Sequence, residues 1–284
     1  MIWMVRLSWL LCLGLGSQVL ALDFTHRARV LAIEDLTHDV KRVRLTLLRP
    51  GEFSFKPGQF VFLRVPEDFV REWNARYGTA HGSIFRPYSF ASPPSRLPEF
   101  DFIIKHFRAP PGKDVPPGVA STYIHTRLQP GDVLHLSDPT GTLYLGQDSD
   151  RPILVVAGGS GAAPFVGLLE YWFEQGMDRT RTIHFFFGVR SRRDLILHGL
   201  FSKWAAEKRN FTYTPALSAP REGDDWNGET GYIQLSVEKY VEAPSEAEAY
   251  LAGPPIMVKM VTEVLRTKGI PDSRIFYDQI LARE

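Results

Sequence analysis

The 284-residue chain contains a single cysteine, Cys12, which lies in the apolar N-terminal stretch. This scarcity excludes an internal disulfide framework, a zinc site with cysteine ligands and an iron–sulfur cluster held by four cysteines of the chain. The eight histidines are scattered, and no two of them stand beside a carboxylate at metal-ligand spacing. We therefore expect no metal site, so any redox centre has to be a bound organic cofactor.

The chain also lacks an excess of charge of one sign. Its 33 Lys and Arg residues against 32 Asp and Glu residues leave a formal net charge of +1. No global basic field points to a nucleic acid, so we expect no nucleic-acid partner. A hydrophobic content of 44% without low-complexity runs indicates ordinary globular order. The length fits two domains of roughly 100 to 150 residues each.

Long apolar runs are rare, and the one present lies in residues 1–22. Its uncharged part, residues 7–22, is shorter than the roughly 20 residues that span a bilayer comfortably. Arg6 before this run and VLA at 19–21 are also typical of a secretory signal. Three interpretations stay open, namely a membrane anchor, a cleaved signal and a misassigned start codon. For an anchor, Arg27 and Arg29 outnumber Arg6, which places the body of the chain in the cytoplasm.

The pattern of apolar residues changes near residue 148. Before it, alternating segments such as VKRVRLTLL (40–48) and FDFIIKHF (100–107) are separated by Pro and Gly turns. They predict an antiparallel β-barrel over residues 23–147, with one helix in VASTYIHTRL (119–128). After it, apolar strands alternate with helices, which predicts a Rossmann-like domain with a parallel sheet over residues 148–284.

Glycine-rich and proline-rich turns follow several predicted strands of the second domain, where ligands bind in doubly wound sheets. In GGSGAAP (158–164), the glycines let the backbone approach a pyrophosphate, and the next helix directs its N–H groups at that anion. A plain tight turn explains the motif about as well, since it departs from GxGxxG spacing. Similar turns are found at 188–191, 217–218 and 252–255. Chance explains each of the four turns, but it explains all of them together poorly.

The first domain contains FRPYS (85–89), which places a cation, a flat ring and a hydroxyl in one extended segment. These groups suit a flat ring system that carries a diphosphate: Arg86 would pair with phosphate, Tyr88 would stack on the ring, and Ser89 would bond a ring nitrogen. The alternative is an edge strand with an exposed Arg and a half-buried Tyr. GVAS (118–121) favours the ligand site, because it opens a helix with N–H groups and a hydroxyl for a second phosphate contact.

Four motifs in this order, RPYS, GVAS, GGSGAAP and AGPP (252–255), resemble the ferredoxin–NADP reductase superfamily. In that superfamily a FAD-binding barrel precedes a nicotinamide-nucleotide domain. The sequence is also similar to the reductase module of the flavin-bearing subunit of the sodium-translocating NADH:quinone reductase, for example in VPEDFVREW (65–73) and LSAPREGDDWNGETGYI (217–233). The resemblance covers about residues 25 to 284.

The resemblance implies that FAD and NADH or NADPH bind to particular residues. Tyr88 and Ser89 would lie beside the reacting flavin ring as catalytic residues, and Arg86 would bind FAD phosphate. The full set implied for FAD is Arg86, Pro87, Tyr88, Ser89, Lys105, His106, Gly118, Val119, Ala120 and Ser121. The set implied for the nicotinamide nucleotide is Gly159, Ser160, Gly161, Gly188, Arg190, Ser191, Arg192, Gly253, Pro254 and Pro255.

The sequence departs from the related proteins in two ways. Many of them have Cys immediately before GPP, where this chain has Ala252, so a thiol cannot help to position the nicotinamide. The related subunit also has a ferredoxin-like domain with four cysteines, whereas here barrel strands are expected directly after residue 22. We therefore expect the one-electron acceptor to be a separate protein.

The resulting hypothesis is a FAD-dependent reductase that takes hydride from NADH or NADPH and passes electrons singly to a separate acceptor. An iron–sulfur protein is the preferred acceptor, and a quinone or a haem protein could replace it. Two alternatives are a flavin-binding structural or sensory subunit of a membrane redox assembly and a flavin reductase that supplies a monooxygenase.

The choice of nicotinamide nucleotide depends on Arg190, Arg192 and Arg193. Their guanidinium groups could grip a 2′-phosphate or form a solvated helix start, and the resemblance favours NADH. Because NADH is supplied in the cytoplasm, the expected location is the cytoplasm or the cytoplasmic face of the membrane, with residues 1–22 as the anchor.

Overall fold

The computed structural model describes residues 22–143, 149–243 and 245–279. The boundary predicted between residues 147 and 148, and residues 1–21 of the predicted leader, lie outside this part of the chain. None of the helices within it is long and apolar enough to cross a membrane.

The first domain is an antiparallel β-barrel, as predicted. Its strands are β1 (His26–Thr37), β2 (Val40–Leu47), β3 (Phe60–Arg64), β4 (Phe85–Ser89), β5 (Glu99–Lys105) and β6 (Val133–Leu136). They pair in the order β4-β3-β6-β1-β2-β5, and each pairing is antiparallel. A bridge between Phe90 and Phe102 joins the two outer strands, so the sheet closes on itself.

Aromatic rings fill the interior of the barrel. Phe55 stacks on Phe90 with 3.8 Å between ring centroids, and Phe53, Phe100 and Phe102 pack around them. Two helices lie outside, α1 (Glu67–Tyr77) before β4 and α2 (Val119–Thr126) before β6, with short 3₁₀ turns η1 (Pro50–Glu52) and η2 (Pro94–Arg96). Helix α2 lies where the sequence predicts it.

The second domain is a parallel sheet with helices on both faces, also as predicted. Its strands are β7 (Ile153–Gly158), β8 (Ile183–Val189), β9 (Phe211–Leu217), β10 (Glu229–Thr230), β11 (Glu248–Gly253) and β12 (Ile275–Gln279). Their order is β10-β9-β8-β7-β11-β12, and all pairings are parallel. The strand order reverses between β7 and β11, which is where ligands bind in such sheets.

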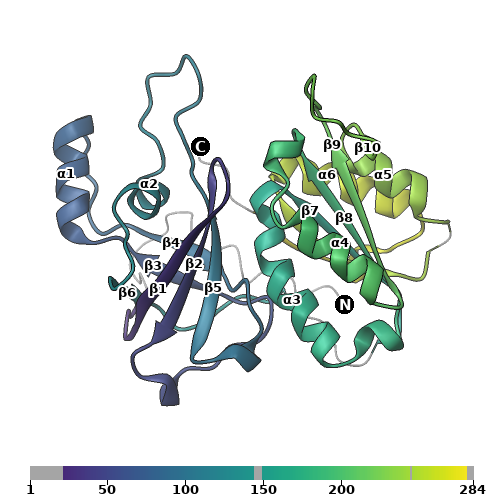
Figure 1. The fold of residues 1–284 in the computed structure, drawn as a ribbon, viewed down its shortest axis with the longest axis horizontal. Coiled ribbons are helices and arrows are strands. Elements are labelled where there is room, and N and C mark those ends of the chain that lie inside the picture. The colour runs from purple at the N-terminus through teal and green to yellow at the C-terminus, as the bar shows by residue number, and fades with distance from the viewer. Residues whose placement is uncertain (1–21, 144–148, 244, 280–284) are drawn as a thin grey trace, which may run out of the picture.

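Helices α3 (Ala163–Glu174) and α4 (His198–Glu207) cover one face of this sheet, and α5 (Ile233–Tyr240) and α6 (Pro255–Thr267) cover the other (Figure 1). The alternation of side chains in β8 explains the two layers, because Phe185 and Phe187 face α3 and α4 while Phe186 faces α5 and α6. Four further 3₁₀ turns are η3 (Gly159–Ala162), η4 (Met177–Arg179), η5 (Arg192–Asp194) and η6 (Asp272–Arg274).

One of the buried apolar clusters spans the two domains. Val40, Ala91 and Ile103 of the barrel belong to the same buried cluster as Phe165 and Val166 of α3. Helix α3 is therefore packed between the parallel sheet and the barrel (Figure 1).

Candidate functional site

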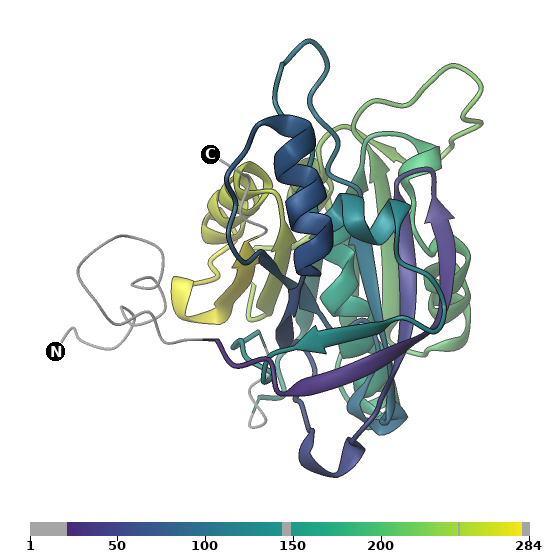
Figure 2. The ribbon, with the colours of Figure 1, turned by 90° about the vertical axis from the view of Figure 1, so that its left-hand side faces the viewer.

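The segments singled out in the sequence gather at one end of the molecule. The loop between β5 and α2 and the loop after β9 project from the same end in both views (Figures 1 and 2). Because the second sheet is parallel, the carboxyl ends of all its strands, with their glycine turns, lie at this end too.

Strand β4 presents Arg86, Tyr88 and Ser89 at the edge of the barrel sheet. Arg86 is exposed, and among the described residues its guanidinium group donates only to the neighbouring Phe85 carbonyl, at 2.8 Å. Tyr88 is half-buried against Phe102, and burial raises the pKa of its phenol although the charge of Arg86 opposes that shift. Within the same part of the chain the Ser89 hydroxyl has no hydrogen-bond partner. A guanidinium, a neutral ring and a hydroxyl are thus all accessible to a ligand. Pro87 is tolerated here because β4 pairs along its length only with β3, and the bridge that closes the barrel lies beyond it at Phe90.

The start of α2 offers backbone N–H donors, but the hydroxyl of its serine already forms hydrogen bonds within the protein. The first N–H groups of a helix have no acceptor inside it, which leaves those of Val119, Ala120 and Ser121 available to an anion. The buried Ser121 hydroxyl accepts from the Phe107 N–H at 3.1 Å and donates to the Gly118 carbonyl at 3.0 Å. This hydroxyl therefore fastens the helix start to the end of β5, and a phosphate contact from it is not needed to explain the serine.

Lys105 and His106 at the end of β5 face the β1–β2 turn. Lys105 Nζ lies 3.2 Å from a carboxylate oxygen of Asp39, and the His106 N–H donates to the Asp39 carbonyl. The His106 ring bonds Thr122 Oγ1 at 3.2 Å. Burial, followed by the charge of Arg108, lowers the pKa of His106, so the ring is neutral near pH 7. The FAD-binding role that the resemblance implies for these two side chains thus competes with contacts inside the protein.

The glycines of the GGSGAAP turn serve different purposes. Gly159 has φ +55°, a left-handed conformation, and faces open space. Gly161 presses against β11, where a Cβ atom would lie 2.3 Å from the Ala252 carbonyl oxygen. Gly158 similarly packs against Pro254 and Met257. The turn after β7 and the turn after β11, with Gly253, Pro254 and Pro255, are therefore in direct contact at the point where the strand order reverses, with Ser160 half-buried between two glycines.

Some residues after β8 already make contacts or hydrogen bonds within the protein, and others do not. A Cβ atom on Gly188 would lie 2.8 Å from Ile233, so a glycine is needed here for α5 to pack against β8. Buried Ser191 caps η5, since both its N–H and its hydroxyl donate to Asp194 Oδ2. Arg190 is exposed. The Arg192 guanidinium donates to the carbonyls of Asp224 at 2.7 Å and of Asp225 at 3.3 Å.

Each of the two domains matches the model of a known protein family. An oxidoreductase FAD-binding domain matches residues 27–144, and an oxidoreductase NAD-binding domain matches residues 155–263. The chain belongs to the FAD- and NAD-binding oxidoreductases. The resemblance to the ferredoxin–NADP reductase superfamily is thereby confirmed, and the cofactors of this flavoprotein are FAD and a nicotinamide nucleotide, as predicted.

Two relatives illustrate the range of the family. The chain is 32% identical over 258 residues to the phenol hydroxylase P5 protein of Acinetobacter pittii, covering 90% of the chain and 66% of the relative. It is 32% identical over 263 residues to a subunit of the Na(+)-translocating NADH-quinone reductase of Neisseria meningitidis, covering 84% of the chain and 64% of the relative. The chain thus spans slightly less than two thirds of the length of these relatives.

Solved structures have the same fold. The cytochrome P450 reductase GcoB of Amycolatopsis superposes with a TM-score of 0.73 at 24% identity, covering 89% of this chain and 69% of that one. The ferredoxin reductase in carbazole 1,9a-dioxygenase gives a TM-score of 0.71 at 26% identity, covering 90% and 69%.

The residues present suit the two cofactors. The exposed Arg86 guanidinium, the Ser89 hydroxyl and the N–H groups at the start of α2 are the donors that a flavin ring and a diphosphate require. The turn after β7 leaves the backbone of Gly159 open to a second nucleotide. Two surface hollows of about 300 and 340 Å³ lie elsewhere, beside Arg64 and Tyr123 on the barrel, and contain none of these donors.

Sequence reasoning missed contacts that cross from one domain to the other. His38 in the β1–β2 turn lies 3.7 Å from Asp39 and 3.8 Å from Asp194. These three side chains are close enough together to hold a metal ion, but Asp39 already pairs with Lys105 and Asp194 already binds Ser191. No local sequence signal marks such a contact, because its partners are more than 150 positions apart.

Proposed function

We propose that this reductase takes a hydride from NADH onto FAD held by the barrel and passes the electrons singly to a separate acceptor. The observation that carries the proposal is that one buried cluster spans both domains. The barrel presents the donors of β4 and of the start of α2, and the parallel sheet presents the glycine turns after β7 and β11 at the carboxyl ends of its strands. Hydride transfer between two bound ring systems requires close stacking and no side-chain acid or base.

The chain's own residues would act by holding and orienting. Arg86 and the N–H groups of α2 would fix the diphosphate of FAD, because charged and dipolar donors bind phosphate strongly. Tyr88, whose phenol stays neutral, would pack against the flavin ring, and Ser89 would donate its hydroxyl to a ring nitrogen. Bound FAD supplies the ability to accept two electrons together and release them one at a time. The turns after β7 and β11 would bring the nicotinamide to the other side of that ring.

The acceptor that we propose is a separate iron–sulfur protein, with a quinone or a haem protein as the alternatives. Relatives named as a phenol hydroxylase component and as part of a quinone reductase support a role within a larger electron-transfer system.

We further propose that residues 1–22 attach the protein to the cytoplasmic face of a membrane, where NADH is available. Cell fractionation of a tagged chain tests this location, and recovery of a trimmed periplasmic protein would contradict it.

The experiment that tests the function measures NADH-dependent reduction of ferricyanide and of an iron–sulfur ferredoxin by the purified, FAD-loaded protein. We expect turnover while FAD stays bound through gel filtration. Flavin that is reduced without any turnover would favour the sensory module, and flavin that is lost on the column would favour the reductase of diffusible flavin.

A matched pair of variants locates the FAD site. Arg86→Gln should weaken FAD binding by about tenfold or more, because a charged contact to phosphate is lost. Arg29→Gln removes an exposed strand arginine on β1 and should leave FAD binding unchanged. Equal FAD binding by both variants would contradict the assignment of Arg86.

A further inference from the structure

Helix α3 lies directly on the chain segment that follows β4. A Cβ atom on Gly167 would lie 2.7 Å from the Ser92 carbonyl oxygen and 2.8 Å from the Ser92 nitrogen, so only a glycine allows this approach. Glu170 and Glu174 follow on the same face of the helix, as the helical period requires. Glu170 binds Arg96, and Glu174 accepts from the Ser95 hydroxyl at 2.8 Å. We call this contact the α3 seam, formed by Ser92, Ser95 and Arg96 of the barrel with Gly167, Glu170 and Glu174 of α3.

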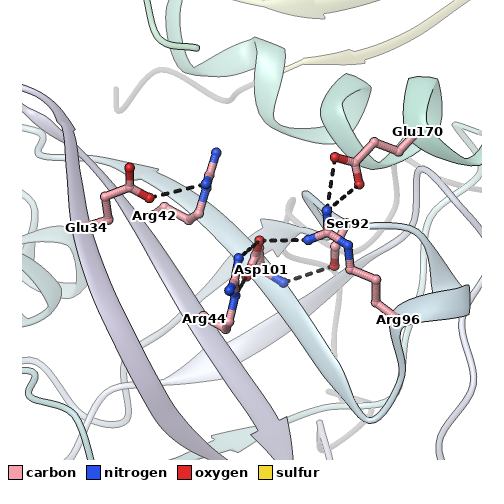
Figure 3. Close-up of polar contacts among 7 residues, drawn as sticks. All are labelled: Glu34, Arg42, Arg44, Ser92, Arg96, Asp101 and Glu170. Carbon is pink, nitrogen blue, oxygen red and sulfur yellow. Dashed lines mark hydrogen bonds and ion pairs between the residues drawn. The ribbon is translucent and has the colours of Figure 1, made fainter. Parts of the chain in front are cut away.

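Arg96 joins two carboxylates from different domains (Figure 3). Its guanidinium lies 3.2 Å from Asp101 Oδ2 in the barrel and 2.8 Å from Glu170 Oε2 on α3. Asp101 is only 3% exposed and is fixed from two other sides, because Arg44 Nε lies 3.0 Å from it and its N–H donates to the Ser92 hydroxyl at 3.0 Å. The buried aspartate thus anchors Arg96, which reaches from it to the second domain.

The ion pair across the seam contributes little to folding stability. The Arg96 side chain is 40% exposed, and exposed ion pairs contribute little because water and dissolved ions screen them. Burial raises the pKa of Glu170 although the charge of Arg96 opposes the shift. The unfavourable free energy of removing this carboxylate from water is therefore at least as large as the favourable free energy of its pairing with Arg96. Such a pair can instead select one orientation of the two surfaces.

The seam lies between the two segments that hold the cofactors. Ser92 is three residues beyond Ser89 of the flavin segment, and Gly167 is six residues beyond Gly161 of the nucleotide turn. The chain between them is the end of η3 and the first turn of α3, so about 10 Å of continuous helical backbone joins the two glycines. A shift or tilt of α3 at the seam is therefore passed to the nucleotide turn with little room for the chain to absorb it.

We propose that the α3 seam sets the spacing between the nicotinamide and the flavin, with Arg96 and Glu170 as positioning residues and Gly167 as the spacer. This inference rests on the proposed function and names the part of the molecule that makes the transfer geometry. Hydride transfer is sensitive to such geometry, because a misplacement of about 1 Å can slow a reaction about a hundredfold.

The first test measures the rate of flavin reduction at saturating NADH, together with the NADH concentration that gives half that rate. Arg96→Met, Glu170→Gln and Gly167→Ala should each slow the limiting rate by about tenfold to a hundredfold and leave FAD content and half-saturation nearly unchanged. Arg44→Met is the matched control, since it also leaves Asp101 with one guanidinium but does not touch the second domain. It should reduce flavin at the wild-type rate.

The second test uses FAD-free protein and does not depend on activity. Spin labels at the exposed helix positions Ala75 of α1 and Ser202 of α4, in a Cys12→Ser background, report the distance between the domains. We expect a single narrow distance distribution for the wild type and for Arg44→Met. Glu170→Gln should broaden it, and Gly167→Ala should shift it.

The outcomes separate this inference from the function on which it rests. If wild-type flavin is not reduced by NADH, the proposed function fails. If wild-type flavin is reduced, but the seam variants keep the wild-type rate and distance distribution, the positioning role alone is wrong. The same conclusion follows if Arg44→Met slows reduction as much as Arg96→Met. Glu170→Gln is nearly isosteric, so it keeps the test valid should Arg96→Met fail to fold.

Discussion

At the scale of single residues, a carboxylate occupies the loop that faces the start of η5. Asp224 accepts the N–H groups of Arg221 at 2.8 Å and of Arg192 at 3.2 Å, and these bonds lower the pKa of its carboxyl. The Arg192 guanidinium is held by carbonyls of the same loop. An ionised carboxylate and an occupied guanidinium both disfavour a nucleotide that carries a 2′-phosphate, which supports the proposed preference for NADH.

Neutralising Asp224 should therefore relax this preference. We expect Asp224→Asn to raise the ratio of kcat/KM for NADPH to that for NADH by roughly tenfold, because a repulsive charge is removed. Asp225→Asn is the matched control, as Asp225 is exposed and its φ of +45° suits asparagine. Steady-state kinetics with both nucleotides measures the ratio. An equal change in both variants would show that Asp224 has no special part in the choice.

His184 on β8 makes stability depend on pH. Its ring bonds Thr214 Oγ1 at 2.8 Å and stacks on Phe186, and burial lowers its pKa to about 4. The unfolded chain binds a proton near pH 6.5 and the folded chain only near pH 4, so folding loses stability as the pH falls between these values. The loss should reach about 2 to 3 kcal/mol.

His184→Gln separates this effect from the other histidines. Urea unfolding of both proteins, from neutral pH down to about pH 4, should give a steeper decline for the wild type than for the variant. Parallel curves would mean that His184 does not titrate in this way.

The sequence could identify the residue types of the site but not the use of each hydroxyl. Ser89 and Ser121 look equivalent beside a phosphate-binding motif, yet the first is free and the second joins β5 to α2. Ser191 follows a strand in the expected place, but its hydroxyl caps η5 through Asp194. Hydrogen bonds of this kind depend on the exact approach of two segments, which residue types alone do not specify.

At the scale of elements, the turns after β7 and β11 are built to touch each other. Gly161→Ala would place a methyl group 2.3 Å from the Ala252 carbonyl, and neither backbone can move far because both residues are buried. We expect a lower melting temperature and about tenfold weaker NADH binding or more, with FAD binding to the barrel nearly unchanged.

Gly199 provides the control for this substitution. It lies exposed in α4 with nothing within 4 Å of its would-be Cβ atom, so Gly199→Ala should stabilise the helix by up to about 1 kcal/mol and leave NADH binding alone. Calorimetric titration with NADH and thermal melts of both variants decide the point. Unchanged NADH affinity in Gly161→Ala would contradict the proposed nucleotide site.

Elements with a strong local pattern could be predicted from the sequence. The fully apolar β7 and the helix α2 after PPG both lie where expected, since strand and helix periods are visible in short windows. The packing of α3 against the barrel could not be predicted. Its apolar residues indicate a buried helix, but the need for a glycine at position 167 follows only from the close approach of the Ser92 backbone in the structure.

At the scale of the whole molecule, the two domains are joined by apolar and polar contacts. Buried residues of the barrel and of α3 form a single cluster, and the α3 seam adds polar contacts beside it. The fold class of each domain follows from local sequence patterns. Their mutual arrangement depends on partners such as Arg96 and Glu170, which are 74 positions apart and carry no motif. The residues that would govern the distance between the cofactors are thus the ones that could not be identified from the sequence.

The proposed function requires that a flavin in the barrel and a nicotinamide on the parallel sheet meet across this interface. Anaerobic rapid mixing of the FAD-loaded protein with NADH tests it most directly, with the flavin absorbance as the signal. We expect bound flavin to bleach fully, at a rate that saturates with NADH. Protein that stays colourless when FAD is added, or bound flavin that keeps its colour at saturating NADH, would show that the two cofactors do not meet in this way.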